Sequence, residues 1–334
     1  MKINLNTAIS QTTIIFISLL YGFLNGSGFY GYNIDYHLEY YKENLSYPLI
    51  FDKLGIILST LTINKFHVGV YLTSFIISFS AGIFINKCIK INFVNKFIKK
   101  NTYHYLFFLF IYLLTLHIHP LIMSTSGAMR QGWVMSFIFF SLTLFLNQKL
   151  FLGLIFSFIA IFMHKSGVIY FSYLLFTFIS LGFLKKVKNY YNLIFLLFFF
   201  GITLTLVSSF FMYQLKIQNI FQAYDRVVYG DFRLFWLFFN LTYICIYCYF
   251  SKSNLFPLFD YPALFLYFSS WGNISFYILG YNDQFERLNM IIGVVYIFLS
   301  ALILKKYFFM ITFILIIFYL FLTIYQGMYS IGLY

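Results

Sequence analysis

The sequence predicts an all-α fold, a polytopic bundle of transmembrane helices, on three observations. First, the chain is 62% hydrophobic and 9% charged over 334 residues, with 49 Phe and 31 Tyr. This balance leaves too few polar groups to cover the surface of a soluble domain. Second, apolar runs of about 20 residues, the length that crosses a bilayer, recur along the chain. Third, lysine is concentrated in alternate connecting segments, which is typical of cytoplasmic loops.

The hydropathy pattern predicts roughly eleven spans, with about ten to about twelve as the range. Residues 1–334 are therefore expected to form a single integral membrane domain, whose longer outer loops are 25–66 and 213–234. The expected spans are 8–24, 67–86, 103–122, 131–147, 150–163, 168–184, 191–212, 235–250, 263–280, 288–304 and 307–325.

Two segments near the N-terminus need separate interpretation. The apolar stretch 14–24 follows Lys2 and has no small-residue cleavage site after it, so we expect an uncleaved first span. The stretch 54–63 is apolar but too short to cross, so we expect an interfacial or re-entrant helix. If 54–63 did cross, the side of the N-terminus would be reversed.

Lysine and arginine are sorted to opposite sides of the expected membrane. One set of segments holds twelve lysines with a single acid, Asp260, and the other holds all four arginines, five lysines and eight of the nine acids. The lysine-rich set is expected to be cytoplasmic. Arginine, which can bind phosphate or carboxylate through two parallel hydrogen bonds, is therefore expected outside. The twelve lysines are Lys87, Lys90, Lys96, Lys99, Lys100, Lys149, Lys185, Lys186, Lys188, Lys252, Lys305 and Lys306.

The remaining composition argues against other classes of site. A net charge of +13 could indicate a nucleic-acid protein, but the excess is explained by cytoplasmic lysine that meets anionic lipid, so no nucleic acid is expected. Cys245 and Cys248 have C-x-x-C spacing within an apolar run and no second ligand pair, which favours buried structural thiols. No acidic D-x-D cluster occurs, so we expect neither a metal nor another cofactor.

The first outer loop carries acids and tyrosines after a glycine-rich entry. Asp35 and Glu39 are one helical turn apart, so both carboxylates could share one face of a helix. Tyr36 belongs to a set that also includes Tyr32 and Tyr40. These rings suit either a platform for stacking sugars or an interfacial aromatic belt, and composition favours the two equally.

The fourth expected span opens with Arg130 and Gln131. Ser and Thr at 124–126 can cap the helix, whose free backbone N–H groups would then point outward. Together with Arg130 they would form an anion site. The alternative is an arginine that reaches lipid phosphate, but an outward arginine opposes the usual charge bias.

Three further residues are candidates. His164, followed by Lys165 and Ser166, joins two spans on the outer side and could act as a general base or as a phosphate donor. Arg226 lies in the loop 213–234, where two acids and two arginines could simply pair with each other. Arg287 enters the tenth expected span at its outer mouth.

Taken together, these segments resemble the EpsG family of bacterial exopolysaccharide proteins and, more broadly, Wzy-type polysaccharide polymerases. Asp35-Tyr36 after the glycine-rich loop is similar to the family's early G-x-D-Y segment, and Met129-Arg130-Gln131-Gly132 to its Arg-Gln helix start. Phe162-Met163-His164-Lys165-Ser166 is similar to a Phe/His/Ser span end, and Arg287 to a late arginine. The family's arginine before the first motif is replaced here by Asn25 and Ser27.

The resemblance implies a glycosyltransferase in the bacterial cytoplasmic membrane, active on the periplasmic or extracellular face, and is compatible with a GT-C-like architecture. It would polymerise repeat units carried on undecaprenyl pyrophosphate, with membrane lipid, a flippase and a chain-length regulator as candidate partners. Arg130 and Arg287 would hold the pyrophosphate, assisted by Arg226, with Gln131 and Tyr36 also binding substrate. Asp35 would orient or deprotonate the acceptor, with His164 as the alternative base.

Two other functions fit the pattern less well. A flippase for the same glycan would need polar groups at the bilayer midplane, where the spans offer few breaks, such as Asn240 and Asn273. A membrane acyltransferase would need a buried catalytic histidine, for which His164 is the only outer candidate.

Overall fold

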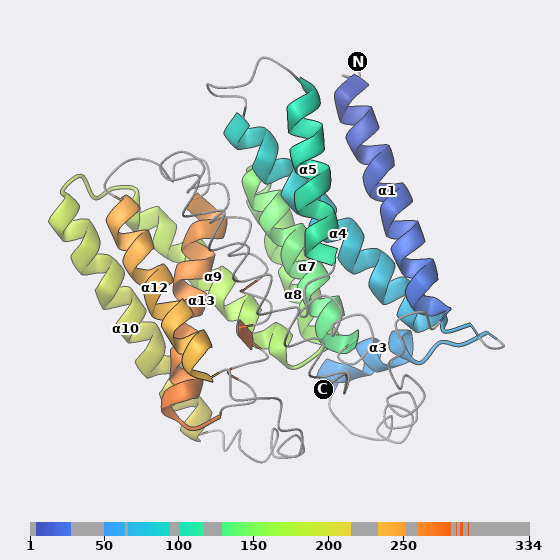
Figure 1. Cartoon of the computed structure of the whole chain (residues 1–334). Helices are drawn as coiled ribbons and strands as arrows, with labels where there is room; N and C mark the ends of the chain where they lie inside the picture. The colour runs from blue at the N-terminus through green and yellow to red at the C-terminus, as the bar shows by residue number, and fades with distance from the viewer. Residues whose placement is uncertain are drawn as a thin grey trace. The chain divides into compact units, whose positions relative to one another are not determined.

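The computed structural model describes most of the chain, and the described part is helical. It covers residues 5–27, 50–63, 66–93, 101–116, 129–214, 233–251 and 260–281, with Phe285, Leu288, Asn289 and Gly293. The helices, shown in Figure 1, are α1 (Leu5–Gly26), α3 (Ile50–Ser59), α4 (Val68–Phe93), α5 (Asn101–Leu116), α7 (Met129–Leu146), α8 (Leu150–Met163), α9 (Ser166–Leu184), α10 (Tyr190–Gln214), α12 (Arg233–Ser251) and α13 (Asp260–Ile278).

Within these ranges, five helices are long and apolar enough to cross a membrane. They are Ala8–Gly26, Val68–Lys90, Met129–Leu146, Ser166–Leu184 and Tyr190–Phe210. Leu150–Met163 and Trp236–Tyr249 are shorter apolar helices. The expected class, a helical membrane protein, is therefore confirmed, while the full set of eleven spans stays a prediction. The last two expected spans, 288–304 and 307–325, fall almost entirely beyond the described residues.

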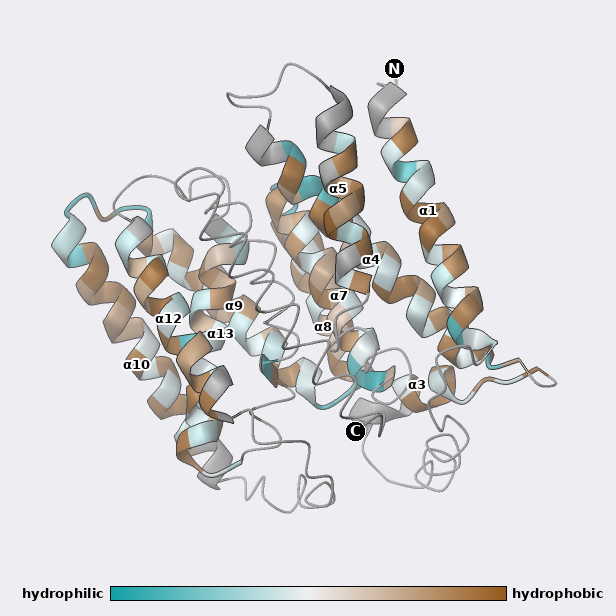
Figure 2. Cartoon of the chain, in the orientation of Figure 1, coloured by the Kyte–Doolittle hydropathy of each residue, from teal (hydrophilic) through white to brown (hydrophobic). Residues whose placement is uncertain are grey.

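The helix surfaces have the character that a bilayer requires. Large apolar side chains such as Phe16, Phe195 and Phe238 are more than half exposed. Water would disfavour so much exposed apolar surface, whereas acyl chains cover it without cost. In Figure 2, brown residues run along most of the helices, while teal gathers at the turn between α9 and α10. That turn carries Lys185 and Lys186.

The described residues form two compact units, with the boundary after Phe171 inside α9. In the first unit, α4 packs against α1, α3, α5 and α7. Glycine permits the close approach of α1, because a Cβ at Gly22 would lie 3.0 Å from the Tyr71 backbone oxygen. Buried Tyr112 links α5 to α4 and α1. Its hydroxyl donates to the Ser78 carbonyl at 3.0 Å and lies 3.0 Å from the Ser18 hydroxyl.

The segment that connects α1 to α4 begins and ends at the same end of the first unit. The His67 N–H donates to the Gly26 carbonyl at 3.1 Å, so the last turn of α1 adjoins the start of α4. Between them, α3 has only ten residues, a length of about 15 Å, which is half of a hydrocarbon core. Because the chain returns to the end that it left, α3 does not reverse the side of the N-terminus. The helix begins four residues before the apolar stretch expected from Leu54.

The second unit is built around α13, which packs against α10 and α12. The Phe176 and Phe268 rings meet edge to face at 4.8 Å, and Tyr247 lies 4.9 Å from Tyr267. At the lysine-rich turn, the Lys185 ammonium lies 5.5 Å from the centre of the Tyr261 ring. These contacts join the described part of α9 beyond Phe171, and α12, to neighbouring residues of one central helix.

Candidate functional site

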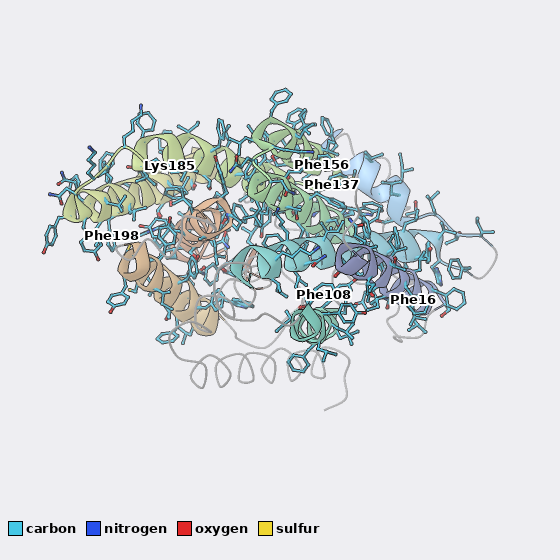
Figure 3. All side chains as sticks on the ribbon, turned by 90° about the horizontal axis from the view of Figure 1, so that it is seen from above. Phe16, Phe108, Phe137, Phe156, Lys185 and Phe198 are labelled. Atoms are coloured by element: carbon cyan, nitrogen blue, oxygen red, sulfur yellow. The ribbon has the colours of Figure 1, made fainter. Side chains whose placement is uncertain are left out.

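The helical hairpin of α7 and α8 determines where the candidate residues of the first unit lie along the helix axes. Phe156 of α8 lies 6.1 Å from Phe137 and 5.7 Å from Phe140 of α7, and Figure 3 shows Phe137 and Phe156 beside each other. A Cβ at Gly153 would meet the Phe145 ring. Extending this antiparallel register places Arg130 opposite residues close to His164. We call this end of the hairpin, where α7 begins and α8 ends, the Arg130 end.

Arg130 and Gln131 lie in the first turn of α7 and are buried, with 7% and 6% of their surfaces exposed. The first N–H groups of a helix have no partner within it, and the helix dipole makes this end positive. A guanidinium held there in a poorly hydrated setting attracts an anion more strongly than a surface arginine does. The first turn of α7 therefore has the chemistry of a site for phosphate or carboxylate.

His164 is held in a defined orientation by the turn between α8 and α9. Its backbone is extended, at φ −165° and ψ 149°, and ends α8. The Ser166 N–H donates to His164 Nδ1 at 3.2 Å, and the Ser166 hydroxyl lies 2.9 Å from the same nitrogen. Because Nδ1 accepts the backbone N–H, the proton of the neutral ring is on Nε2. The half-buried ring thus offers a donor, which suits binding of an anion better than the role of general base.

A short helix covers the Arg130 end. α3 contacts both α7 and α8, and a Cβ at Gly55 would collide with the Met163 carbonyl oxygen, the residue before His164. The far end of α3 is equally close to α4, since a Cβ at Gly69 would meet the Ser59 backbone. Glycine at 55 and 69 therefore lets α3 lie backbone to backbone against its neighbours.

Gly167 holds the His164 turn in place, and its replacement should be costly. A Cβ there would collide with the Ala160 backbone, whereas a Cβ at Gly182 of the same helix would meet nothing within 4 Å. We expect Gly167→Ala to destabilise the purified protein by about 1–3 kcal/mol. Gly182→Ala should be neutral or gain up to about 1 kcal/mol from helix propensity. Thermal unfolding of both variants in one detergent measures the difference, and equal behaviour would contradict the close contact between Gly167 and Ala160.

The other predicted site residues fall outside the described ranges. Asp35, Tyr36, Arg226 and Arg287 are all in segments on which the structure gives no placement. The structure thus places Arg130, Gln131 and His164 at the same end of the α7–α8 hairpin. The predicted contributions of the remaining four residues stay predictions.

Sequence reasoning missed two features. The first is the cover that α3 forms over the site, for which the available signal was Gly55, since glycine inside a short apolar helix indicates close packing. The second feature is a buried amide network in the second unit. Tyr173 donates to Asn273 Oδ1 at 3.2 Å, and Asn273 and Asn240 both donate to Asn289 Oδ1, at 3.2 and 2.8 Å.

Comparison with known proteins identifies no relative of the chain. No protein-family model, no curated protein sequence and no solved structure matches the chain.

Proposed function

We propose that this chain is a membrane glycosyltransferase that polymerises oligosaccharide repeat units carried on undecaprenyl pyrophosphate. It would act at the outer face of a bacterial cytoplasmic membrane, in the synthesis of exopolysaccharide, capsule or O-antigen. The observation that carries the proposal is that buried Arg130 and His164, whose Nδ1 accepts a hydrogen bond, lie at the same end of the first unit. The resemblance of the same two segments to Wzy-type polymerases supports it.

The sidedness of the first unit agrees with this proposal. Lys87 and Lys90 lie near the end of α4, and Lys149 lies in the α7–α8 turn, all at the end of the helices opposite to His164. By the positive-inside rule, that end faces the cytoplasm and the Arg130 end faces outward. Lipid-linked repeat units are polymerised after export, so an outward anion site suits them.

The proposed reaction follows from the residue chemistry. A hydroxyl oxygen of the acceptor attacks the anomeric carbon of the donor glycan, and the bond from that carbon to the pyrophosphate oxygen breaks. The leaving pyrophosphate takes the bonding electrons, and Arg130, Gln131 and His164 donate hydrogen bonds to its growing charge. Asp35 takes the proton of the acceptor hydroxyl.

The proposal also includes parts on which only the sequence bears. Tyr36 would stack on sugar, and Arg226 and Arg287 would add charge for the pyrophosphate. The chain would have about eleven spans, compatible with a GT-C-like architecture. A flippase would supply its substrate, and a chain-length regulator would be a second partner.

Reconstitution tests the function directly. The purified full chain, placed in vesicles with lipid-linked repeat units and no nucleotide sugar, should produce a ladder of longer lipid-linked glycans. Asp35→Asn protein, incorporated in equal amount, should leave only single units. A wild-type preparation that binds the substrate but yields no ladder would exclude the polymerase.

The amide network favours one alternative, a flippase for the same glycan. Asn240, Asn273 and Asn289 are fully buried, the first in α12, the second in α13 and the third in a helical position beyond α13. Polar groups at such depth are typical of transport pathways. In cells with Asn289→Leu, single lipid-linked units trapped on the cytoplasmic face would identify transport, whereas correctly exported glycan would exclude it.

A further inference from the structure

Four buried donor groups of the first unit have no hydrogen-bond partner among the residues that the structure describes. They are Asn25 Nδ2, Ser59 Oγ, Ser74 Oγ and Trp133 Nε1. The two serines are fully buried, and Asn25 and Trp133 are 3% and 4% exposed. Burial of an unsatisfied donor costs free energy, so each such group calls for an explanation, and several at one end of a bundle suggest a ligand. We call these four residues the donor cluster.

Asn25 and Ser59 both lie near the joint between α1, α3 and α4. Asn25 precedes Gly26, whose carbonyl accepts the His67 N–H. Ser59 is the last residue of α3, and its backbone lies against Gly69 in the first turn of α4. Both donors therefore belong to the end of the unit that α3 covers.

Ser74 and Trp133 belong to the same end by the register of α4 and α7. These helices pack against each other, and both run from the Arg130 end toward the end that carries Lys90 and Lys149; Phe84 lies 5.7 Å from Phe139 and Phe79 6.3 Å from Phe140. That register places Ser74 level with the first two turns of α7. Arg130 and Trp133 lie within those turns.

Neighbouring hydroxyls show that the helices could have satisfied these groups. Thr73 donates to the Gly69 carbonyl at 2.8 Å, Ser80 to Ile77 at 3.0 Å and Ser136 to Gly132 at 2.9 Å. Back-bonding of this kind is the ordinary solution for a hydroxyl in a membrane helix. Ser74 lies between Thr73 and Ser80 on one helix and makes no such bond.

We propose that the donor cluster, together with Arg130, binds the phosphoryl oxygens of a pyrophosphate group. Every member offers an N–H or O–H, so the complementary ligand is rich in acceptors, and the guanidinium favours one that is negatively charged. Five donor side chains from four helices can surround a ligand with many acceptor oxygens, as pyrophosphate has. The proposal rests on the proposed function only in assigning this group to a lipid-linked glycan.

Binding of inorganic pyrophosphate to the purified full chain in lipid nanodiscs tests the proposal. Ser74→Ala and Trp133→Phe should each weaken binding about tenfold, because each removes one hydrogen bond to a charged acceptor. Ser80→Ala in the same helix and Ser269→Ala in the second unit are matched controls, since both serines are fully buried. Both controls should bind as the wild type does.

A second readout separates binding from folding. Because Ser74 makes no hydrogen bond within the described fold, Ser74→Ala without ligand should melt at or above the wild-type temperature. Ser80→Ala should melt at or below it. A large loss of stability in Ser74→Ala, with weakened binding explained by unfolding, would overturn the proposal.

Further arms identify the ligand. Tighter binding of farnesyl pyrophosphate than of inorganic pyrophosphate would support a lipid-linked source, and equal binding would support the pyrophosphate group alone. Wild-type affinity in Ser74→Ala and Trp133→Phe, or binding of a neutral disaccharide in place of pyrophosphate, would overturn the proposal. If the chain binds pyrophosphate through the donor cluster yet makes no ladder, the proposed binding site stands and the proposed polymerase activity is excluded.

Discussion

Cells in which Arg130 is replaced by Ala should accumulate single repeat units on the lipid carrier and make no long polymer. Arg130 is buried at the first turn of α7, where it can meet a pyrophosphate leaving group with two parallel hydrogen bonds. Loss of one preorganised donor to a developing negative charge lowers a rate about 10²- to 10³-fold. Gel separation of glycans from cells with matched protein levels measures the effect.

Two further variants test whether the planar pair of guanidinium donors matters as well as the positive charge. Arg130→Lys keeps the charge but has no planar pair of donors, so its polymer should be short and scarce. Lys149→Ala removes an exposed cation from the other end of the same hairpin and should leave the ladder unchanged. Long polymer from Arg130→Ala at normal protein levels would sink the assignment of the site.

The helices themselves could be predicted well because apolar length alone determines them. The expected span 150–163 is α8 as observed, and 131–147 differs from α7 by two residues at its start. The shared end of Arg130 and His164 was predictable too. Two consecutive spans joined by a short turn must run in opposite directions, so the start of the first lies beside the end of the second.

The packing of the site could not be predicted, because it depends on contacts distant in sequence. Gly55 reads as an unremarkable residue in a short apolar run until α3 lies on the Met163 carbonyl. Ser74 looks like any hydroxyl of a membrane helix until its missing hydrogen bond is seen. Asn240 and Asn273 were expected as isolated polar breaks, and only the folded chain joins them through Asn289.

The orientation of His164 is a further result that sequence could not provide. The histidine could serve as a base or as a donor until the Ser166 N–H was found to occupy Nδ1. In chymotrypsin-like chemistry a histidine base presents an unprotonated nitrogen to the substrate. Here Nδ1 accepts the Ser166 N–H and Nε2 carries the proton, so the turn itself selects the donor role.

Substitutions of His164 should therefore distinguish the roles of its two ring nitrogens. His164→Asn can still accept the Ser166 N–H, because its side-chain oxygen reaches a backbone donor two residues on, so the turn should fold. It lacks the outer donor, and polymerisation should fall about 10²-fold or more. His164→Gln places an amide N–H near the position of Nε2 and should recover part of that loss. The rate of ladder growth by reconstituted protein measures each variant.

If His164 acts as a general base, the two amide variants should show no such difference. Neither amide can take a proton from an acceptor hydroxyl, so Gln and Asn would be equally inactive if His164 were the base. The double variant Arg130→Ala/His164→Asn adds a second criterion. If both side chains hold one leaving group, the combined loss should be smaller than the product of the single losses, since residues that act on one group are not additive. Independent losses would place His164 on a different part of the substrate.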